Sequence, residues 1–281
     1  CFFPFIISLV ILLMGGFVLS KEPTRKLNRS YCFLCLITFG WQLSWGILFC
    51  FAQRINTDLL IRIGYIPISF IPFALCYFTK VLTEHKPNKL LVFSLICSTV
   101  FSLLALFSNL FVNGYRIFSW GPYPRAGILH PIFLLYIFIS IIQIIKLFLT
   151  QYTHNPKDTK TFLLMTAFII YCGSAIDFLT NYGLPLYPLG FLFLFISYSF
   201  FAYAILKHSF MDISLILSRT GAYILVIGSS AALLSFIAAY PTPIVVKILL
   251  IGLGTIPLIL FGDKLREKLQ TSAEEKWLSD Y

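Results

Sequence analysis

Long apolar runs follow one another along this chain and leave few folds open to it. Each run holds about 20 consecutive, mostly apolar residues, the length that spans the hydrocarbon core of a bilayer. Backbone N–H and C=O groups in hydrocarbon must bond within their own segment, so such runs are expected to be helices. The sequence predicts nine spans, at 2–20, 31–52, 60–82, 90–112, 127–150, 161–181, 186–206, 219–239 and 243–262.

The composition excludes the soluble classes of protein. Hydrophobic residues make up 59% of the chain and charged residues 11%, whereas about a quarter of a typical soluble domain is charged. The alternating pattern of an outer-membrane barrel is absent. The predicted fold class is an all-α integral membrane protein: a seven-helix transmembrane bundle plus a two-helix hairpin, about nine spans in all.

The basic residues predict the orientation of the spans. Of the 21 lysines and arginines, 16 fall in the connections after spans one, three, five and seven or in the C-terminal tail. The other side holds five: Arg54, Arg62, Arg116, Arg125 and Lys247. Positive loops stay in the cytoplasm, which places the N-terminus outside and the C-terminus inside. The net charge of +10 is explained by anionic lipid at the cytoplasmic leaflet, so the bilayer is an expected partner and nucleic acid is not.

Three regions are expected along the chain. Residues 1–207 form a seven-helix membrane domain, and residues 208–262 form a two-helix transmembrane hairpin around a Pro-Thr-Pro turn. Residues 263–281 switch abruptly to a charged, helix-forming composition, typical of the start of a cytoplasmic linker. We expect the native protein to continue beyond Tyr281 and to form a homodimer through this extension. A solvated terminal helix is the alternative.

The sequence offers little for catalysis or metal binding. The seven cysteines lie almost all in apolar runs, and the Cys32–Cys35 pair is interpreted as core packing because it has no second pair or histidine near it. His130 is the one histidine placed near an outer helix end, so a pair of haem ligands at similar depth is not expected. Hydrolase and nucleotide-binding motifs are absent. We expect no catalytic residues, no metal and no cofactor.

Two stretches are rich in aromatic residues, proline and glycine: 113–127 and 177–190. Both are predicted to lie on the outer side of the membrane. Asp177 is the acidic residue placed within an apolar run, where a charge is costly unless it is paired or functional. It is either a structural pin, paired for example with Arg62, or a ligand contact. The predicted pocket has residues 120–127 as its lid. The candidate ligand-binding residues are Trp120, Tyr123, Asp177, Asn181 and Tyr187.

The same stretches carry a resemblance to a known family. Residues 120–127 (WGPYPRAG) resemble the WGxYPxAG stretch of the seven-helix N-terminal sensor region of bacterial histidine kinases. Residues 177–190 (DFLTNYGLPLYPLG) resemble the DFLxxYGxxxYPLG run at the end of the sixth helix of that family, and residues 202–213 resemble its exit from the seventh helix. The resemblance covers about residues 1–215, with its motifs in the second half.

The resemblance implies a sensor module of a bacterial signal-transduction histidine kinase in the inner (cytoplasmic) membrane. Such a module detects an extracellular or membrane-borne ligand, here an unknown small or lipid-like molecule, and relays the signal to a cytoplasmic output domain. The phosphoacceptor and ATP-binding boxes of the kinases are absent, and His208 lacks the acidic neighbour of a phosphoacceptor, so the chain itself is not expected to be an enzyme. The alternative is a small-molecule transporter or channel, which the scarcity of charges in the spans and the lack of an internal repeat disfavour. A membrane enzyme is the third possibility, with no visible catalytic constellation.

Overall fold

The computed structural model describes residues 2–52, 54–85, 88–154 and 159–207 as a helical membrane region. Six helical segments are long and apolar enough to cross a membrane, and a seventh apolar helix, Gly190–Leu206, is shorter. This agrees with seven of the predicted spans. The predicted spans 219–239 and 243–262 and the charged segment 263–281 lie outside the described residues.

The helices and strands follow one another in a simple order. They are α1 (Phe2–Lys21), α2 (Lys26–Phe51), α3 (Thr57–Leu82), α4 (Lys89–Phe107), β1 (Val112–Phe118), β2 (Gly121–Ala126), α5 (His130–His154), α6 (Thr159–Cys172), the short 3₁₀ helix η1 (Gly173–Asp177), α7 (Phe178–Asn181) and α8 (Gly190–Lys207).

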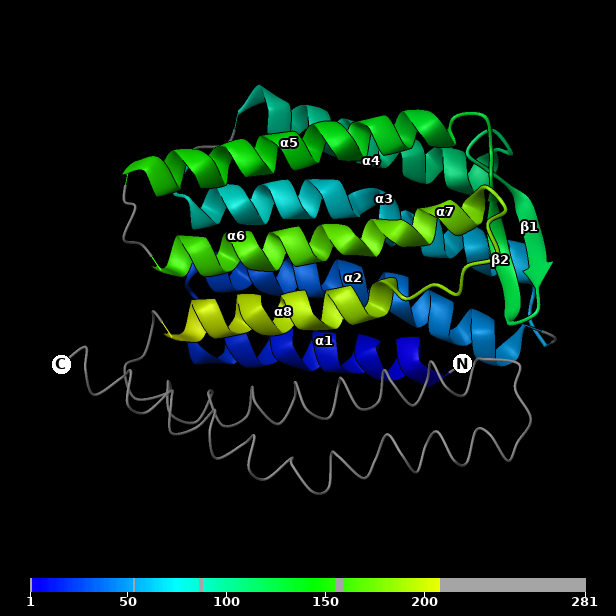
Figure 1. Cartoon of the computed structure of the whole chain (residues 1–281), viewed down its shortest axis with the longest axis horizontal. Helices are drawn as coiled ribbons and strands as arrows, with labels where there is room; N and C mark the ends of the chain where they lie inside the picture. Colours follow the sequence, from blue (N-terminus) through cyan, green and yellow to red (C-terminus); the bar gives the residue numbers. More distant parts are fainter. Residues whose placement is uncertain (1, 53, 86–87, 155–158, 208–281) are drawn as a thin grey trace, which may run out of the picture. The chain divides into compact units, whose positions relative to one another are not determined.

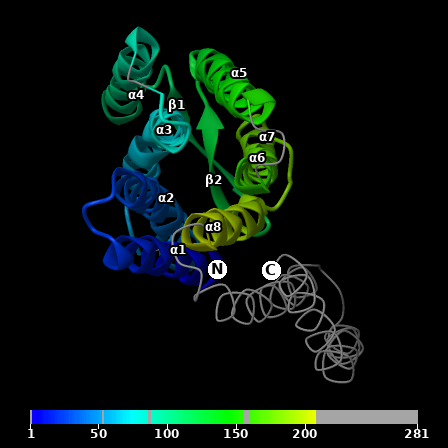
Figure 2. The same cartoon turned by 90° about the vertical axis from the view of Figure 1, so that its left-hand side faces the viewer.

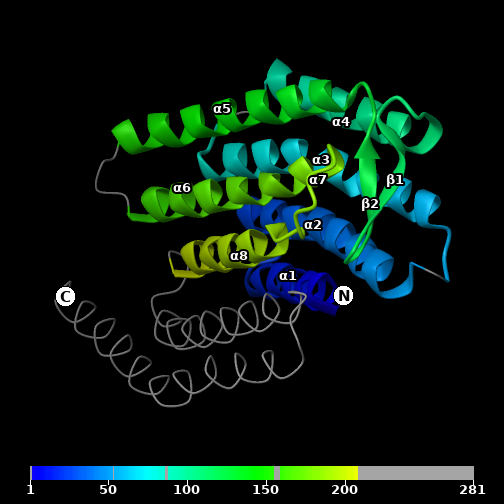
Figure 3. The same ribbon diagram turned by 45° about the vertical axis from the view of Figure 1, so that its right-hand side comes forward.

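The long helices run side by side, and the two strands lie across one end of them (Figure 1). An end-on view shows two rows, with α1 to α4 in one and α5, α6 and α8 in the other (Figure 2). The strands form a hairpin that stands against the ends of α2, α3 and α5 (Figure 3). We call this end of the bundle the hairpin end.

Several helix ends differ from the predicted span ends. The fourth span stops at Phe107 instead of residue 112, because Ser108 is already extended, with φ −144° and ψ 146°. The sixth span is not one continuous α-helix: it changes at Gly173 into the 3₁₀ turn η1 and then α7. A Cβ at Gly173 would lie 2.6 Å from the Phe193 ring, so the glycine lets η1 and α8 approach closely. The seventh helix begins at Gly190, after Pro185 and Pro188 have kept residues 186–189 out of a helix.

The stretch between α4 and α5, predicted as a shaped loop, is a two-stranded antiparallel hairpin. Tyr115 pairs with Pro124 and Phe118 with Gly121, and the register is irregular between Val112 and Tyr115. Gly114 in that irregular part has φ +69°, a left-handed conformation that favours glycine.

The interior of the bundle combines aromatic rings with hydroxyl groups that bond across helices. The Tyr31 hydroxyl of α2 donates to the Tyr198 carbonyl of α8 at 2.9 Å, and the Tyr198 hydroxyl bonds the Thr38 hydroxyl. The second cysteine of the CxxC pair, Cys35, is fully buried against α1, where a Cβ on Gly15 would come within 2.6 Å of it. Cys35 is free and serves as packing, as its apolar surroundings indicated.

Candidate functional site

An aromatic cluster holds the hairpin against the bundle. Its centre is Trp120, at the tip of the hairpin, whose ring centroid lies 5.8 Å from Phe49 of α2, 5.5 Å from Tyr123 and 5.6 Å from Tyr187. The three rings have edge-to-face angles of 76–88° with Trp120, the geometry that aromatic quadrupoles favour. The structure thus brings together Trp120, Tyr123 and Tyr187, three of the residues that the sequence singled out.

Two hydrogen bonds tie the hairpin to the segment after α6. The Tyr123 hydroxyl donates to the Asp177 carbonyl at 3.1 Å, and Arg116 Nη1 donates to the Asn181 carbonyl at 3.1 Å. Burial raises the pKa of Tyr123 well above its usual value, and nearby Asp177 adds to the rise, so the hydroxyl keeps its proton. We call these two bonds the hairpin tether. Both acceptors are backbone oxygens, so the tether fixes the path of the chain at 177 and 181.

Asp177 is a buried carboxylate, 5% exposed, and its partner is the backbone. Its Oδ1 accepts from the Gly190 N–H at 2.9 Å, at the first residue of α8. A carboxylate at a helix N-terminus satisfies N–H groups that have no partner within the helix and meets the positive end of the helix dipole. A Cβ on Gly190 would lie 2.7 Å from Asp177 Cγ, so glycine is what allows this contact. Asp177 thus joins the end of η1 to the beginning of α8.

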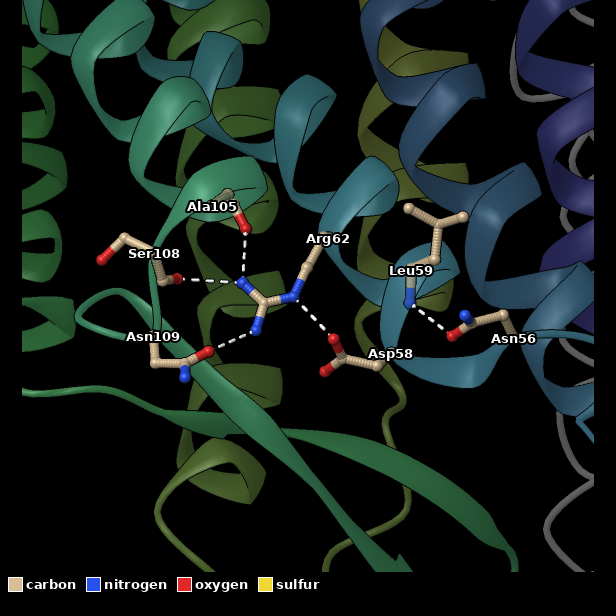
Figure 4. A network of polar contacts seen from close by, with 7 residues as sticks. All are labelled: Asn56, Asp58, Leu59, Arg62, Ala105, Ser108 and Asn109. Atoms are coloured by element: carbon tan, nitrogen blue, oxygen red, sulfur yellow. Dashed lines mark hydrogen bonds and ion pairs between the residues drawn. The ribbon is translucent and has the colours of Figure 1, made fainter.

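Arg62, which the sequence analysis considered as a partner for Asp177, is engaged elsewhere (Figure 4). Its Nε lies 2.7 Å from Asp58 Oδ2, one turn earlier in α3. Its terminal nitrogens donate to the end of α4 and the residues after it: to the carbonyls of Ala105 at 3.0 Å and Ser108 at 2.9 Å, and to Asn109 Oδ1 at 2.6 Å. Arg62 therefore joins α3 to the start of the hairpin connection, and Asp177 is held by Gly190.

A second buried polar cluster lies behind the hairpin. Asn181 Nδ2 donates to the Tyr65 hydroxyl at 2.9 Å and lies 3.2 Å from His130 Nε2. On the other side of the imidazole, His130 Nδ1 lies 2.9 Å from the Tyr182 hydroxyl. A neutral His130 that carries its proton on Nδ1 satisfies all of these contacts, because Nε2 then accepts from Asn181. The cluster joins α3, α5 and α7 at one depth.

Asn181 is the candidate residue that belongs to this second cluster. Its Oδ1 is buried and has no hydrogen-bond partner among the described residues, and the same holds for the indole nitrogen of Trp120. Tyr65, Tyr182 and Phe49 were not predicted as site residues, and His130 was considered only as a haem ligand. A comparison of the depths of polar residues along neighbouring spans could have pointed to Tyr65 and His130. Tyr65 and His130 both lie within eight residues of the first residue of their helix, at the hairpin end.

In the described ranges, no group of three or more histidine, cysteine, aspartate or glutamate side chains is placed to hold a metal ion. The geometry at the hairpin end is that of a polar and aromatic joint between a hairpin and three helices. This joint links the hairpin to α8 through the tether and then through Asp177.

The comparisons with known proteins identify a family. A search of curated proteins and a search of solved structures both find nothing similar to this chain. The family model described as the N-terminal 7TM region of histidine kinase matches residues 3–214. This range includes all seven described apolar helices, the hairpin and the candidate residues, and it is well over half of the 281 residues. The chain therefore belongs to the family of N-terminal seven-transmembrane regions of histidine kinases.

Proposed function

We propose that the chain is the sensor module of a bacterial signal-transduction histidine kinase, which detects an extracellular or membrane-borne ligand and relays it to a cytoplasmic output domain. The family supports a membrane sensor role, and the hairpin end supplies a structural basis for it. The chain itself supplies sensing and no catalysis in this proposal.

The observation that carries the proposal is the continuous connection from the hairpin to α8. The tether binds the hairpin to the backbone at residues 177 and 181, and the Asp177 carboxylate binds the first N–H of α8. A ligand changes the output of a receptor when it binds two arrangements of the helices with different affinities. Small shifts of a packed element are the usual form of such a change. Movement of the hairpin relative to α7 would displace the start of α8 in this way.

The proposed orientation places the hairpin end outside the cell and the opposite end of the bundle in the bacterial cytoplasm, on the basis of the charge asymmetry. Cysteine labelling tests it. A membrane-impermeant probe should react with Ser119→Cys in intact cells and with Asn155→Cys after permeabilisation, in a background without reactive native cysteines. The reverse pattern would contradict the orientation.

The proposed output domain and homodimer depend on a continuation of the native protein beyond Tyr281. The charged segment 263–281 has the composition of a linker helix, and coiled-coil linkers dimerise. The native reading frame beyond Tyr281, and crosslinking of the native protein in its membrane, test these two points directly.

The tether is tested in the native protein in membrane vesicles, with autophosphorylation as the measured output. Tyr123→Phe keeps the ring and removes the hydroxyl that bonds the Asp177 carbonyl. We therefore expect basal phosphorylation to change by about five-fold, the factor that corresponds to a hydrogen bond of about 1 kcal/mol. Tyr115→Phe is the matched control, because Tyr115 lies on the same hairpin and is 43% exposed.

Equal phosphorylation in wild type, Tyr123→Phe and Tyr115→Phe would show that the tether carries no signal. Asp177→Asn completes the series, since an amide oxygen still accepts from Gly190 but carries no charge. A normal thermal stability with a lost response would assign the Asp177 charge to ligand sensing. A lowered stability with an unchanged dose response would assign it to holding α8.

A further inference from the structure

The two strands of the hairpin differ in what their free edges offer to a partner. Within the described residues, β1 and β2 form a two-stranded sheet, so each strand has one edge without a neighbouring strand. β2 packs against α2, α3 and α7, and β1 lies beyond it at the hairpin end (Figure 1). An unpaired strand edge carries a row of backbone N–H and C=O groups that another strand can bind.

Two prolines in β2 determine which backbone groups point to each free edge. In an antiparallel pair of strands, residue pairs that exchange two hydrogen bonds alternate with pairs that exchange none. Pro122 and Pro124 have no N–H to exchange, so both of their pairs are of the second kind. Their partners in β1 are Ile117 and Tyr115. The backbone N–H and C=O groups of these two β1 residues therefore point away from β2, to the free edge.

The free edge of β1 is open, whereas that of β2 is blocked. On β2 the outward-pointing residues are the two prolines, which offer carbonyls and no donor. On β1, Ile117 is 79% exposed and Tyr115 is 43% exposed. Their outward backbone groups have no hydrogen-bond partner in the part of the chain that the structure describes. β1 thus presents a donor and an acceptor at two successive outward positions, the pattern that an added extended strand binds.

The side chains along β1 define what an added strand should carry. Tyr115 and Ile117 lie on the exposed face, whereas Arg116 between them bonds the Asn181 carbonyl through Nη1. None of the ion pairs of the described residues includes Arg116. A residue opposite Arg116 on an added antiparallel strand would have its Cα about 4.5 Å away, because this pair exchanges no bonds. An acidic side chain at that position would pair with the guanidinium.

The charge of the hairpin end favours the same class of partner. From residue 112 to residue 126 the chain carries two arginines, Arg116 and Arg125, and no acidic residue. Arg125 is exposed, as is Arg54 in the connection between α2 and α3. Pairing with the β1 of a second copy would bring arginines next to arginines, whereas an acidic peptide supplies the opposite charge.

We propose that the free edge of β1 binds an extended acidic peptide segment as an added antiparallel strand. The central residue of this segment is acidic and lies opposite Arg116, and the two apolar residues beside it lie opposite Tyr115 and Ile117. The proposal rests on the proposed sensing function for its biological meaning, since it names the class of partner that the hairpin end would detect. The docking itself is a property of the chain and is measured without an output domain.

The experiment uses the full chain in phosphatidylcholine nanodiscs, one chain per disc, and the capped peptide Thr-Val-Glu-Val-Thr at saturating concentration. Amide hydrogen exchange is measured at single residues with and without the peptide. In the free chain, the Tyr115 and Ile117 amides should exchange rapidly and the Arg116 amide, which bonds to β2, slowly. With the peptide bound, exchange at Tyr115 and Ile117 should slow by at least about ten-fold. Unchanged exchange at these two amides would overturn the proposal.

Methylation of single peptide nitrogens supplies a matched comparison. In the proposed register the N–H groups of both valines face β1, so methylation of one valine nitrogen should weaken binding by at least about five-fold. The N–H of the glutamate points away from β1, so its methylation should leave the affinity unchanged. Affinity is measured as the peptide concentration that gives half of the slowing. Equal affinities of the two methylated peptides would overturn the added-strand geometry.

Two arginine variants test the acidic residue of the peptide. Replacement of its glutamate by glutamine should weaken binding to the wild type by up to about five-fold, the strength of a cross-strand ion pair. This preference should fall to about one in Arg116→Gln and persist in Arg125→Gln, which changes an exposed arginine of the same hairpin. If Arg116→Gln does not fold, the wild type and Arg125→Gln still decide the point, since the preference must be present in both. Its loss in Arg125→Gln would overturn the assignment to Arg116.

Measurements without peptide distinguish the other occupants of the edge. Slow exchange of the Tyr115 and Ile117 amides in discs that hold one chain would mean that the chain itself or the bilayer covers the edge. Slow exchange that appears only in discs with two chains would assign the edge to a second copy. Either result would overturn the proposal. The two proposals fail independently: absence of peptide binding overturns this inference alone, whereas peptide binding that leaves phosphorylation of the native protein unchanged overturns the proposed sensing function.

Discussion

The hairpin end and the middle of the bundle bury polar groups of different kinds. At the hairpin end, Arg62, Asp177 and His130 each have close polar partners, several of them backbone groups. In the middle of the bundle, the Trp41 indole N–H has no hydrogen-bond partner among the described residues. An unpaired buried group costs about 1–3 kcal/mol, which a bound partner can remove. The paired groups at the hairpin end therefore contribute stability, whereas the Trp41 N–H contributes none. Asn181 Oδ1 and the Trp120 N–H at the hairpin end are unpaired among the described residues as well.

This difference has a direct consequence for mutations. Removal of one member of a satisfied network leaves its partners unpaired, so changes at the hairpin end should be costly. Removal of a group that has no partner should cost little and can even stabilise the protein. Four substitutions test this asymmetry, with stability measured as the midpoint of thermal unfolding in a fixed detergent.

The largest loss is expected for Gly190→Ala. The new methyl group would lie 2.7 Å from Asp177 Cγ and 3.0 Å from the Ser174 carbonyl, so the Asp177–Gly190 contact must open. We expect a loss of about 3 kcal/mol, or about 10 °C in the unfolding midpoint. Gly16→Ala is the matched control, because its Cβ meets nothing within 4 Å in a regular helix and should be neutral or stabilising. Equal midpoints for the two variants would contradict the close approach at Gly190.

Arg62→Gln should cost about 2–3 kcal/mol, because it removes a charged donor that bonds two carbonyls and an amide at the end of α4. Its control is Asp58→Asn on the same ion pair. The Asp58 side chain is 41% exposed, so this change should cost less than about 1 kcal/mol. If both variants lose the same stability, the ion pair, and not the bonds to α4, holds Arg62.

A loss of about 1–2 kcal/mol is expected for Asn181→Ala, since the Tyr65 hydroxyl loses its donor and His130 Nε2 loses a neighbour. Thr99→Ala provides the control, because the Thr99 hydroxyl bonds a carbonyl of its own helix at an exposed position. A smaller loss for Asn181→Ala than for Thr99→Ala would mean that the cluster behind the hairpin contributes no stability.

Trp41→Phe should change stability by less than about 1 kcal/mol, although Trp41 is 4% exposed. The substitution keeps most of the aromatic contact and deletes an N–H that has no partner among the described residues. This is the prediction that bears most directly on the comparison. A loss as large as that of Asn181→Ala would show that the indole N–H is already engaged, and the two regions would no longer differ.

The sequence predicted the helices well and the hairpin poorly. Apolar length alone located seven helices within the described residues, because a bilayer imposes the same length on every span. The hairpin was predicted as a loop, since Pro122 and Pro124 lack the N–H that a strand normally donates. Its pairing depends on which atoms face the partner strand, and composition carries no such information.

The candidate site was predicted in part for a similar reason. Trp120, Tyr123 and Tyr187 come together, as expected for two aromatic stretches on one side of the bundle. The partner of Asp177 could not be predicted, because it is a backbone N–H, a group that every residue except proline carries. The sequence instead suggested a charged partner, Arg62, which binds backbone carbonyls near the end of α4. Binding of a ligand by the five candidate residues stays a prediction.

The acceptors of the hairpin tether have a consequence for how such sequences can diverge. Tyr123 and Arg116 bond to carbonyl oxygens, so the side chains at 177 and 181 could be exchanged over evolutionary time without loss of these two bonds. Gly183 has no such freedom: its φ is +101°, and a Cβ there would lie 2.9 Å from Arg116 Nη1. The tether itself therefore constrains the backbone and the glycine beside it, whereas Asp177 and Asn181 are constrained by their own side-chain partners, Gly190 and Tyr65.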